Sequence, residues 1–221
     1  MNVSYRFVVI AAIFVTCLIT ANIIAVKIVS LGFVILPAAI FVFPVSYIFG
    51  DVLTEVYGYR WARRLIWLGF LCNLIVVIFV WIGQILPPAS FWTEQKAYES
   101  ILGYTPRLLI ASFAGYLVGE FANSFVLARM KILTKGRWLW SRTIGSTIVG
   151  QGLDTVLFIT LAFGGTPSFV PIIILYHWLA KTVIEAVATP LTYAVVNYLK
   201  KKETIDTYDY KTNFNPLSLL D

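Results

Sequence analysis

The stretch FGDVLTEVYGYRWARR, residues 49–64, places two acids directly after a long uncharged run. The apolar run before it reads as the inside of a lipid bilayer, because it contains no charged side chain. Asp51 and Glu55 then follow four positions apart, on one face of a helix, before the first arginine appears at Arg60. A helix that only crossed a membrane would not need two carboxylates on one face. These acids are therefore expected to hold a partner or a ligand.

The composition is that of an integral membrane protein. Of 221 residues, 59% are hydrophobic and 13% are charged, and the mean hydropathy is +0.83. Soluble domains carry roughly 25% charged residues. The net charge of +6 does not indicate nucleic-acid binding, because the basic residues fall in short clusters between apolar runs, where they set topology. Cys17 and Cys72 lie inside apolar runs, so we expect neither disulfides nor a zinc site.

Six apolar runs reach the length of about 20 residues that a membrane-spanning helix needs. We expect an all-α, six-span transmembrane domain over residues 1–202 and a short, polar, mobile cytoplasmic tail over residues 203–221. The predicted spans are residues 7–29, 33–57, 65–86, 108–129, 143–163 and 170–199.

Lysine and arginine concentrate in alternate connections, which predicts the orientation of the chain. Basic clusters occur at residues 60–64, 129–142 and 200–202, so both termini are expected to be cytoplasmic. Two similar segments, TANIIAVK (residues 20–27) and FANSFVLARMK (residues 121–131), each precede a span with a central acid. This echo suggests two inverted three-helix repeats, an arrangement that places a binding site near the bilayer midplane.

Ionisable side chains within the spans predict a shared polar cavity. Each costs about 2.5–3.5 kcal/mol at the bilayer centre, so it normally faces a partner or a water-filled space. Residues three or four apart share a helix face, and the spacing here gives one polar face on each of four helices. The candidate binding residues are Asp51, Glu120, Asn123, Gln151, Asp154 and Lys181, with Glu55, Glu185 and His177 as possible supporting residues.

Simpler interpretations of some of these residues stay open. Glu55, and less readily Asp51, could pair with the arginines of residues 60–64. Lys181, near the middle of its span, is the natural partner to keep Asp154 ionised. Lys181 and Glu185 could instead form an ion pair within one helix, because they are four residues apart. His177 is more typical of a packed or interfacial histidine than of a proton relay.

The residue types favour a transporter over an enzyme or a channel. The sequence contains no nucleophile elbow, zinc-protease motif or glycine-rich phosphate loop. Asp51 and Asp154 could in principle form an intramembrane aspartyl site, but nothing around them marks a protease. A channel filter would need a ring of like ligands. No cofactor and no metal ion are expected, and the mixed polar groups suit a cavity for a small polar molecule.

Four motifs in order resemble the queuosine precursor transporter family, also described as vitamin uptake transporters. They are DVLTEVYG (residues 51–58), EFANSFVLARMK (residues 120–131), RTIGSTIVGQGLDTVLF (residues 142–158), and Lys181 followed by EAVATP (residues 185–190). The resemblance implies import of 7-cyano-7-deazaguanine and its aminomethyl relative through the inner membrane for tRNA queuosine synthesis. Queuine is a further candidate substrate.

The chemistry of such a base fits the polar residues. A carboxylate can accept from its N1–H and exocyclic amine together, and an amide can donate to its carbonyl group. Asp154 or Glu120 is the candidate for the amine edge, and Asn123 or Gln151 for the carbonyl group.

Other functions remain as alternatives. They are a substrate-binding subunit of an energy-coupling-factor importer, a transporter of another heterocycle or vitamin, and a structural membrane protein. The sequence leaves open the coupling ion, an ATPase partner and a homodimer.

Overall fold

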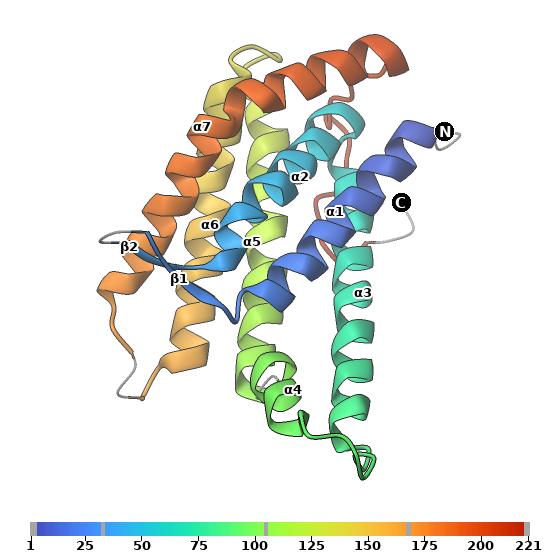
Figure 1. Ribbon diagram of the computed structural model, residues 1–221. Coiled ribbons are helices and arrows are strands. Elements are labelled where there is room, and N and C mark those ends of the chain that lie inside the picture. Colours follow the sequence, from blue (N-terminus) through green and yellow to red (C-terminus); the bar gives the residue numbers. More distant parts are fainter. Residues whose placement is uncertain (1–3, 32–33, 104–105, 167–168, 219–221) are drawn as a thin grey trace.

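The computed structural model describes residues 4–31, 34–103, 106–166 and 169–218. Long helices run together in one bundle, with a short two-stranded hairpin part-way along it (Figure 1). The all-α prediction is confirmed except for this hairpin. The elements in chain order are α1 (Tyr5–Ile24), β1 (Ile28–Leu31), β2 (Val34–Pro37), η1 (Ala38–Phe41), α2 (Phe43–Tyr57), α3 (Tyr59–Ile85), α4 (Gln95–Leu102), α5 (Pro106–Leu133), α6 (Leu139–Phe163) and α7 (Ile172–Glu203).

The outer surface of the bundle is apolar. Phe79, Trp81 and Val187 are each more than half exposed, and many other large apolar side chains accompany them. A soluble monomer rarely exposes apolar surface on this scale, whereas lipid solvates it. Among the described residues, five stretches are long and apolar enough to cross a membrane: Tyr5–Ile24, Tyr59–Ile85, Gln95–Leu133 (which contains both α4 and α5), Leu139–Phe163 and Ile172–Glu203.

The predicted second span, residues 33–57, is not a single helix. Its helical part is α2, which has 15 residues and is therefore about 22 Å long at 1.5 Å per residue. That is shorter than the hydrocarbon core of about 30 Å. The predicted first span, residues 7–29, is helical only as far as Ile24, where α1 ends. The prediction of six continuous membrane-spanning helices is therefore wrong for the described residues.

The hairpin between α1 and α2 accounts for this difference. β1 and β2 pair antiparallel, with Ile28 opposite Pro37, and both strands are rich in β-branched residues that favour extended structure. Pro37 also disfavours a helical conformation for the residue before it, whereas Pro44 fits the first turn of α2. Hydropathy alone does not separate an apolar strand from an apolar helix. As a result, α2 begins part-way along the bundle (Figure 1).

The chain after α7 folds back over the junction between α2 and α3. We call this segment, residues 204–218, the C-terminal strap. The backbone N–H of Thr207 donates to the carbonyl oxygen of Val56 at 3.2 Å. The Asp209 carboxylate accepts from the backbone N–H of Tyr59, the first residue of α3, at 3.1 Å. Asp209 thus caps the start of α3, which supplies no side-chain cap of its own.

Arg63 in α3 fixes the far half of the strap. Its guanidinium is fully buried and donates to the carbonyl oxygens of Asn213 at 2.8 Å and Asn215 at 2.9 Å. The indole N–H of Trp67 donates to the carbonyl oxygen of Pro216 at 2.8 Å. Bonds from an ionised donor are stronger than neutral ones. The prediction of a mobile tail is therefore wrong for the described part of this segment.

We expect Asp209→Ala to lower the thermal unfolding midpoint of the purified protein. Losing a helix cap costs about 0.5–2 kcal/mol, and the freed strap should become accessible to protease. Lys211→Ala is the matched control, because Lys211 is an exposed strap residue. Equal midpoints and equal strap cleavage in the two variants would contradict the capping role.

Candidate functional site

Four helices bring acidic, amide and cationic side chains into one group, here called the polar cluster. Five of its seven members are buried, and the other two, Asp154 and Lys181, are partly exposed. The helix-face spacing in the sequence correctly predicts this grouping, although a role in binding a substrate stays a prediction. The polar cluster consists of Asp51 from α2, Glu120 and Asn123 from α5, Gln151 and Asp154 from α6, and Lys181 and Glu185 from α7.

Asp51 links α2 to α5 through a direct hydrogen bond. The Asn123 side-chain amide donates from Nδ2 to Asp51 Oδ1 at 2.8 Å, and both residues are buried. One turn further along α2, the Thr54 hydroxyl group donates to the Ser124 hydroxyl oxygen at 3.2 Å. Two neighbouring polar contacts therefore hold α2 against α5, and they fix the direction of the Asp51 carboxylate.

Asp154 and Lys181 form an ion pair between α6 and α7. Lys181 Nζ lies 2.6 Å from Asp154 Oδ2, and the side chains are 11% and 23% exposed for Lys181 and Asp154 respectively. This contact decides between two interpretations of the sequence. Lys181 does not make the predicted ion pair with Glu185 on its own helix in the described contacts, and it reaches across to α6 instead.

Glycines let α5 and α6 approach closely at the polar cluster. A Cβ atom on Gly115 would lie 2.7 Å from Asp154 Oδ1, and one on Gly119 would lie 2.7 Å from Asp154 Cβ. On the facing helix, a Cβ atom on Gly150 would lie 2.6 Å from Asn123 Cβ. Real Cβ atoms essentially never come that close. The small residues therefore set the position of Asp154 as well as the packing of the helices.

Several buried acceptor atoms of the polar cluster have no hydrogen-bond partner among the described residues. Both carboxylate oxygens of Glu185 are in this state, and Glu185 is completely buried. The same holds for Asp51 Oδ2, Asn123 Oδ1 and Gln151 Oε1. Most buried polar atoms in proteins have a partner. The polar cluster therefore contains more buried acceptor atoms than the described donors satisfy.

Glu55 lies one turn from Asp51 but in a different environment. It is completely buried, and three cationic side chains surround its Oε1 atom. Arg142 Nη2 lies 2.8 Å away, Lys200 Nζ 2.7 Å away and Lys131 Nζ 3.6 Å away. The two acids on one helix face therefore have different roles. Glu55 joins four helices electrostatically, whereas Asp51 belongs to the polar cluster.

The prediction that Glu55 pairs with basic side chains is confirmed, but the predicted partners are wrong. The arginines of residues 60–64 lie beyond the end of α2, and Arg63 is directed to the strap. Arg142 and Lys131, 87 and 76 residues away in sequence, contact Glu55 instead. A single sequence gives no signal for such a pairing between distant helices.

Asp206 of the strap extends this ion network. Its Oδ1 atom lies 2.5 Å from Lys131 Nζ and 2.8 Å from Lys200 Nζ. Partial burial acts to raise the pKa of Asp206, but the hydrogen bonds from both lysines outweigh it and hold the pKa below its ordinary value. Asp206 therefore stabilises the fold above its unfolded pKa of about 3.9. That contribution is lost as the pH falls through the lower pKa of the folded protein.

Two further side chains lie on the helix faces that form the polar cluster. Tyr47 on α2 is one turn before Asp51 and within electrostatic range of Glu120, Asp154 and Glu185. Sequence reasoning missed Tyr47, although its four-residue spacing from Asp51 was a usable signal. His177 lies one turn before Lys181 on α7 and is partly exposed, and its supporting role stays a prediction.

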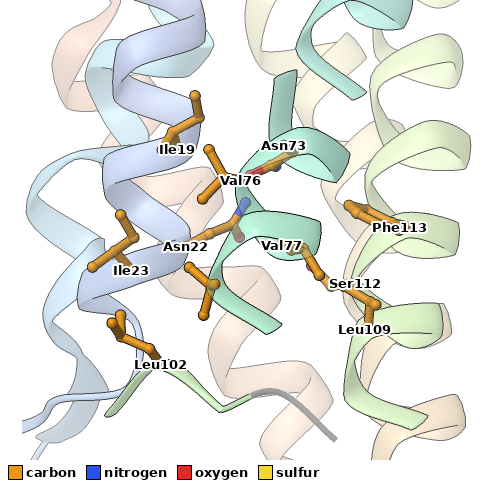
Figure 2. A pocket seen from close by; sticks show the side chains of 11 residues that line it. Ile19, Asn22, Ile23, Asn73, Val76, Val77, Leu102, Leu109, Ser112 and Phe113 are labelled. Atoms are coloured by element: carbon orange, nitrogen blue, oxygen red, sulfur yellow. The ribbon is translucent and has the colours of Figure 1, made fainter. Parts of the chain in front are cut away.

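A small cavity lies between α1, α3 and α5, and none of the polar-cluster residues lines it (Figure 2). Its volume is about 30 Å³, which is room for about one water molecule. Val76, Val77 and Phe113 give it a largely apolar wall, and Asn22 and Asn73 add polar groups. It is too small for a heterocyclic base, so it does not compete with the polar cluster as the candidate site.

Comparison with known proteins identifies the family. A family model described as "Putative vitamin uptake transporter" matches residues 37–195, which is most of the chain. The chain belongs to this family. The matched range contains every residue of the polar cluster. Membership in this family of multi-pass membrane transporters also confirms that the protein is a transporter and not an enzyme.

Three relatives carry a more specific name. A "Probable queuosine precursor transporter" of Bacillus subtilis (strain 168) is 34% identical over 157 residues, covering 69% of this chain and 68% of the relative. The "Queuosine precursor transporter" of Escherichia coli (strain K12) is 24% identical, covering 66% of this chain and 62% of the relative. A "Probable queuosine precursor transporter" of Haemophilus influenzae is 28% identical, covering 55% and 49%. No solved structure matches this chain.

We expect Glu55→Gln to destabilise the protein rather than to weaken substrate binding selectively. Removing one partner of a buried ion pair costs about 3–5 kcal/mol, because the remaining charges stay buried and uncompensated. The thermal midpoint in detergent should fall clearly. Glu99→Gln is the matched control, since Glu99 is an exposed residue of α4. A Glu55→Gln protein as stable as this control would show that the network does not hold the helices together.

Proposed function

We propose that this family member imports queuosine precursors, which are 7-deazaguanine bases, through the inner membrane for tRNA modification. The names of the three relatives support this substrate class. The observation that carries the proposal is the surplus of buried acceptor atoms in the polar cluster. A 7-deazaguanine is rich in donors, since its N1–H, exocyclic amine and pyrrole N–H can all donate.

We propose that acidic side chains of α6 and α5 bind the amine edge of the base. Asp154 is the partly exposed acid of the polar cluster, so an entering base would meet it first. Its carboxylate, or that of the neighbouring Glu120, would accept from N1–H and the exocyclic amine together, which is a strong arrangement away from water. The Gln151 amide on the same face of α6 would donate to the carbonyl group, because the Asn123 amide already donates to Asp51. Tyr47 could cover the ring face, as aromatic residues do for unstacked bases.

We propose that the chain crosses the membrane six times, with both termini in the cytoplasm. In this arrangement α2 completes the second crossing together with the hairpin and η1. Non-helical backbone is tolerated at membrane depth where protein surrounds it. Helices α1 to α3 and α5 to α7 would form two inverted halves that move about the polar cluster.

The topology predicts which loops react with an impermeant thiol reagent. In a variant with Cys17 and Cys72 replaced by alanine, Lys135→Cys should react only after the cells are made permeable. Lys96→Cys, in the α4 region, should react in intact cells. The reverse pattern would overturn the orientation.

Queuosine content tests the substrate class. A cell that cannot make 7-cyano-7-deazaguanine should regain queuosine in its tRNA from low external precursor only when this chain is expressed. An inactive but well-expressed Asp154→Asn protein is the negative control. Unchanged queuosine content with the wild-type protein at normal membrane levels would refute the proposal.

The Asp154–Lys181 pair allows a sharper test of the site. Asp154→Asn replaces an acceptor with a donor, and by the cost of an unmet buried group it should weaken base affinity about a hundredfold. If Asp154 only neutralised Lys181, the double variant with Lys181→Gln would regain uptake of labelled base. We expect no recovery, because the acceptor for the amine edge is still absent. Asp154→Glu should be milder than either variant.

A further inference from the structure

We propose that Glu185 and Asp51 form a subsite for the substituent at position 7 of the base. This inference rests on the proposed function. When protonated, the subsite donates a hydrogen bond to the nitrile of the cyano base. When ionised, it binds the primary ammonium group of the aminomethyl base, and the proton it held leaves to water. One pair of acids would then accept both substrates, which differ in charge.

The surroundings of Glu185 favour binding of a cation or a proton by its carboxyl group. Glu185 is completely buried, and neither of its oxygens has a hydrogen-bond partner among the described residues. Glu185 is the charged group that acts most strongly on Asp51, whose Oδ2 atom also has no partner there. Among the described residues, Glu120 on α5 lies within electrostatic range of both acids, Glu55 on α2 lies within range of Asp51, and Tyr47 on α2 lies within range of Glu185. Asp154 on α6 and Lys181 on α7 lie in turn within range of Glu120.

The cations near the pair are already engaged with other acids. Lys181 donates to Asp154 at 2.6 Å, and the cations that lie one turn further along α2 contact the Glu55 carboxylate. An unpaired carboxylate in an apolar interior binds a proton instead of staying charged. The empty subsite therefore holds at least one proton. A bound ammonium group can take the place of that proton and leave the net charge of the pair unchanged.

The shape of the base makes a separate subsite necessary. The substituent at position 7 lies beside the carbonyl group, on the opposite side of the molecule from the exocyclic amine. If Asp154 on α6 accepts from the amine edge and Gln151 donates to the carbonyl group, the substituent requires a partner on another helix. Glu185 on α7 and Asp51 on α2 meet that requirement, since both lie within the polar cluster.

Calorimetric binding of each base to the purified full-length protein tests this subsite. Titration near neutral pH in two buffers of different ionisation enthalpy counts the protons exchanged. We expect about one proton released per aminomethyl base, because its ammonium group, like that of lysine, is charged at this pH. We expect none for the cyano base. Over the range in which the pair stays protonated when empty, the affinity for the aminomethyl base should rise about tenfold per pH unit.

Variants of Glu185 separate the subsite from the rest of the site. Glu185→Gln cannot ionise, so it should lose about a hundredfold in affinity for the aminomethyl base, as charge-assisted bonds are lost, and its proton release should vanish. Its affinity for the cyano base should fall severalfold at most, because an amide can still donate to a nitrile. Glu185→Asp should keep the charge-dependent preference, and Glu99→Gln, outside the site, should behave as wild type. Melting curves would confirm that each variant is folded.

Three outcomes would overturn the inference. Equal losses for both bases in a folded Glu185→Gln protein would mean that Glu185 does not distinguish the substituents. Unchanged proton release in that variant would mean that Glu185 does not hold the exchanged proton. Failure of folded wild-type protein to bind either base would refute the proposed function, and this inference with it, whereas the first two results would leave that function intact.

Discussion

A carboxylate buried between membrane helices requires a cation, hydrogen-bond donors or a proton, because lipid supplies none of them. The protein meets this constraint in three different ways. Glu55 is surrounded by Arg142, Lys200 and Lys131, and Asp154 is paired with Lys181. Asp51 has one oxygen bonded to Asn123 and one without a described partner. Neither carboxylate oxygen of Glu185 has a hydrogen-bond partner among the described residues. The proposed site is where this compensation is incomplete.

The ion network and the strap close one end of the bundle together. Glu55 draws side chains from α5, α6 and α7 onto α2, and Asp206 connects the strap to two of the same lysines. Arg63 and Asp209 then attach the strap to α3. The two acids of α2, Glu55 and Asp51, therefore lie in different electrostatic environments. Around Glu55 three cationic side chains face the carboxylates of Glu55 and Asp206, whereas the described hydrogen bond to the Asp51 carboxylate comes from the neutral amide of Asn123.

Helix-face spacing predicted the polar cluster well, because residues three or four apart must share a face in any helix. The position of both residues near the middle of their spans also predicted the Asp154–Lys181 contact, which the structure shows at 2.6 Å. The prediction of one helix for the second span was wrong because apolar strands and apolar helices have the same hydropathy. The partners of Glu55 and the strap contacts could not be predicted, because they join residues that are 70 or more positions apart.

The most direct test of the central claim is an experimental structure with 7-cyano-7-deazaguanine bound. The account predicts that the base lies between α2, α5, α6 and α7. Its amine edge should be within hydrogen-bond distance of the Asp154 or Glu120 carboxylate, and its nitrile should point toward Glu185 and Asp51. A base bound between α1, α3 and α5, or one whose amine edge faces no acid, would contradict the account.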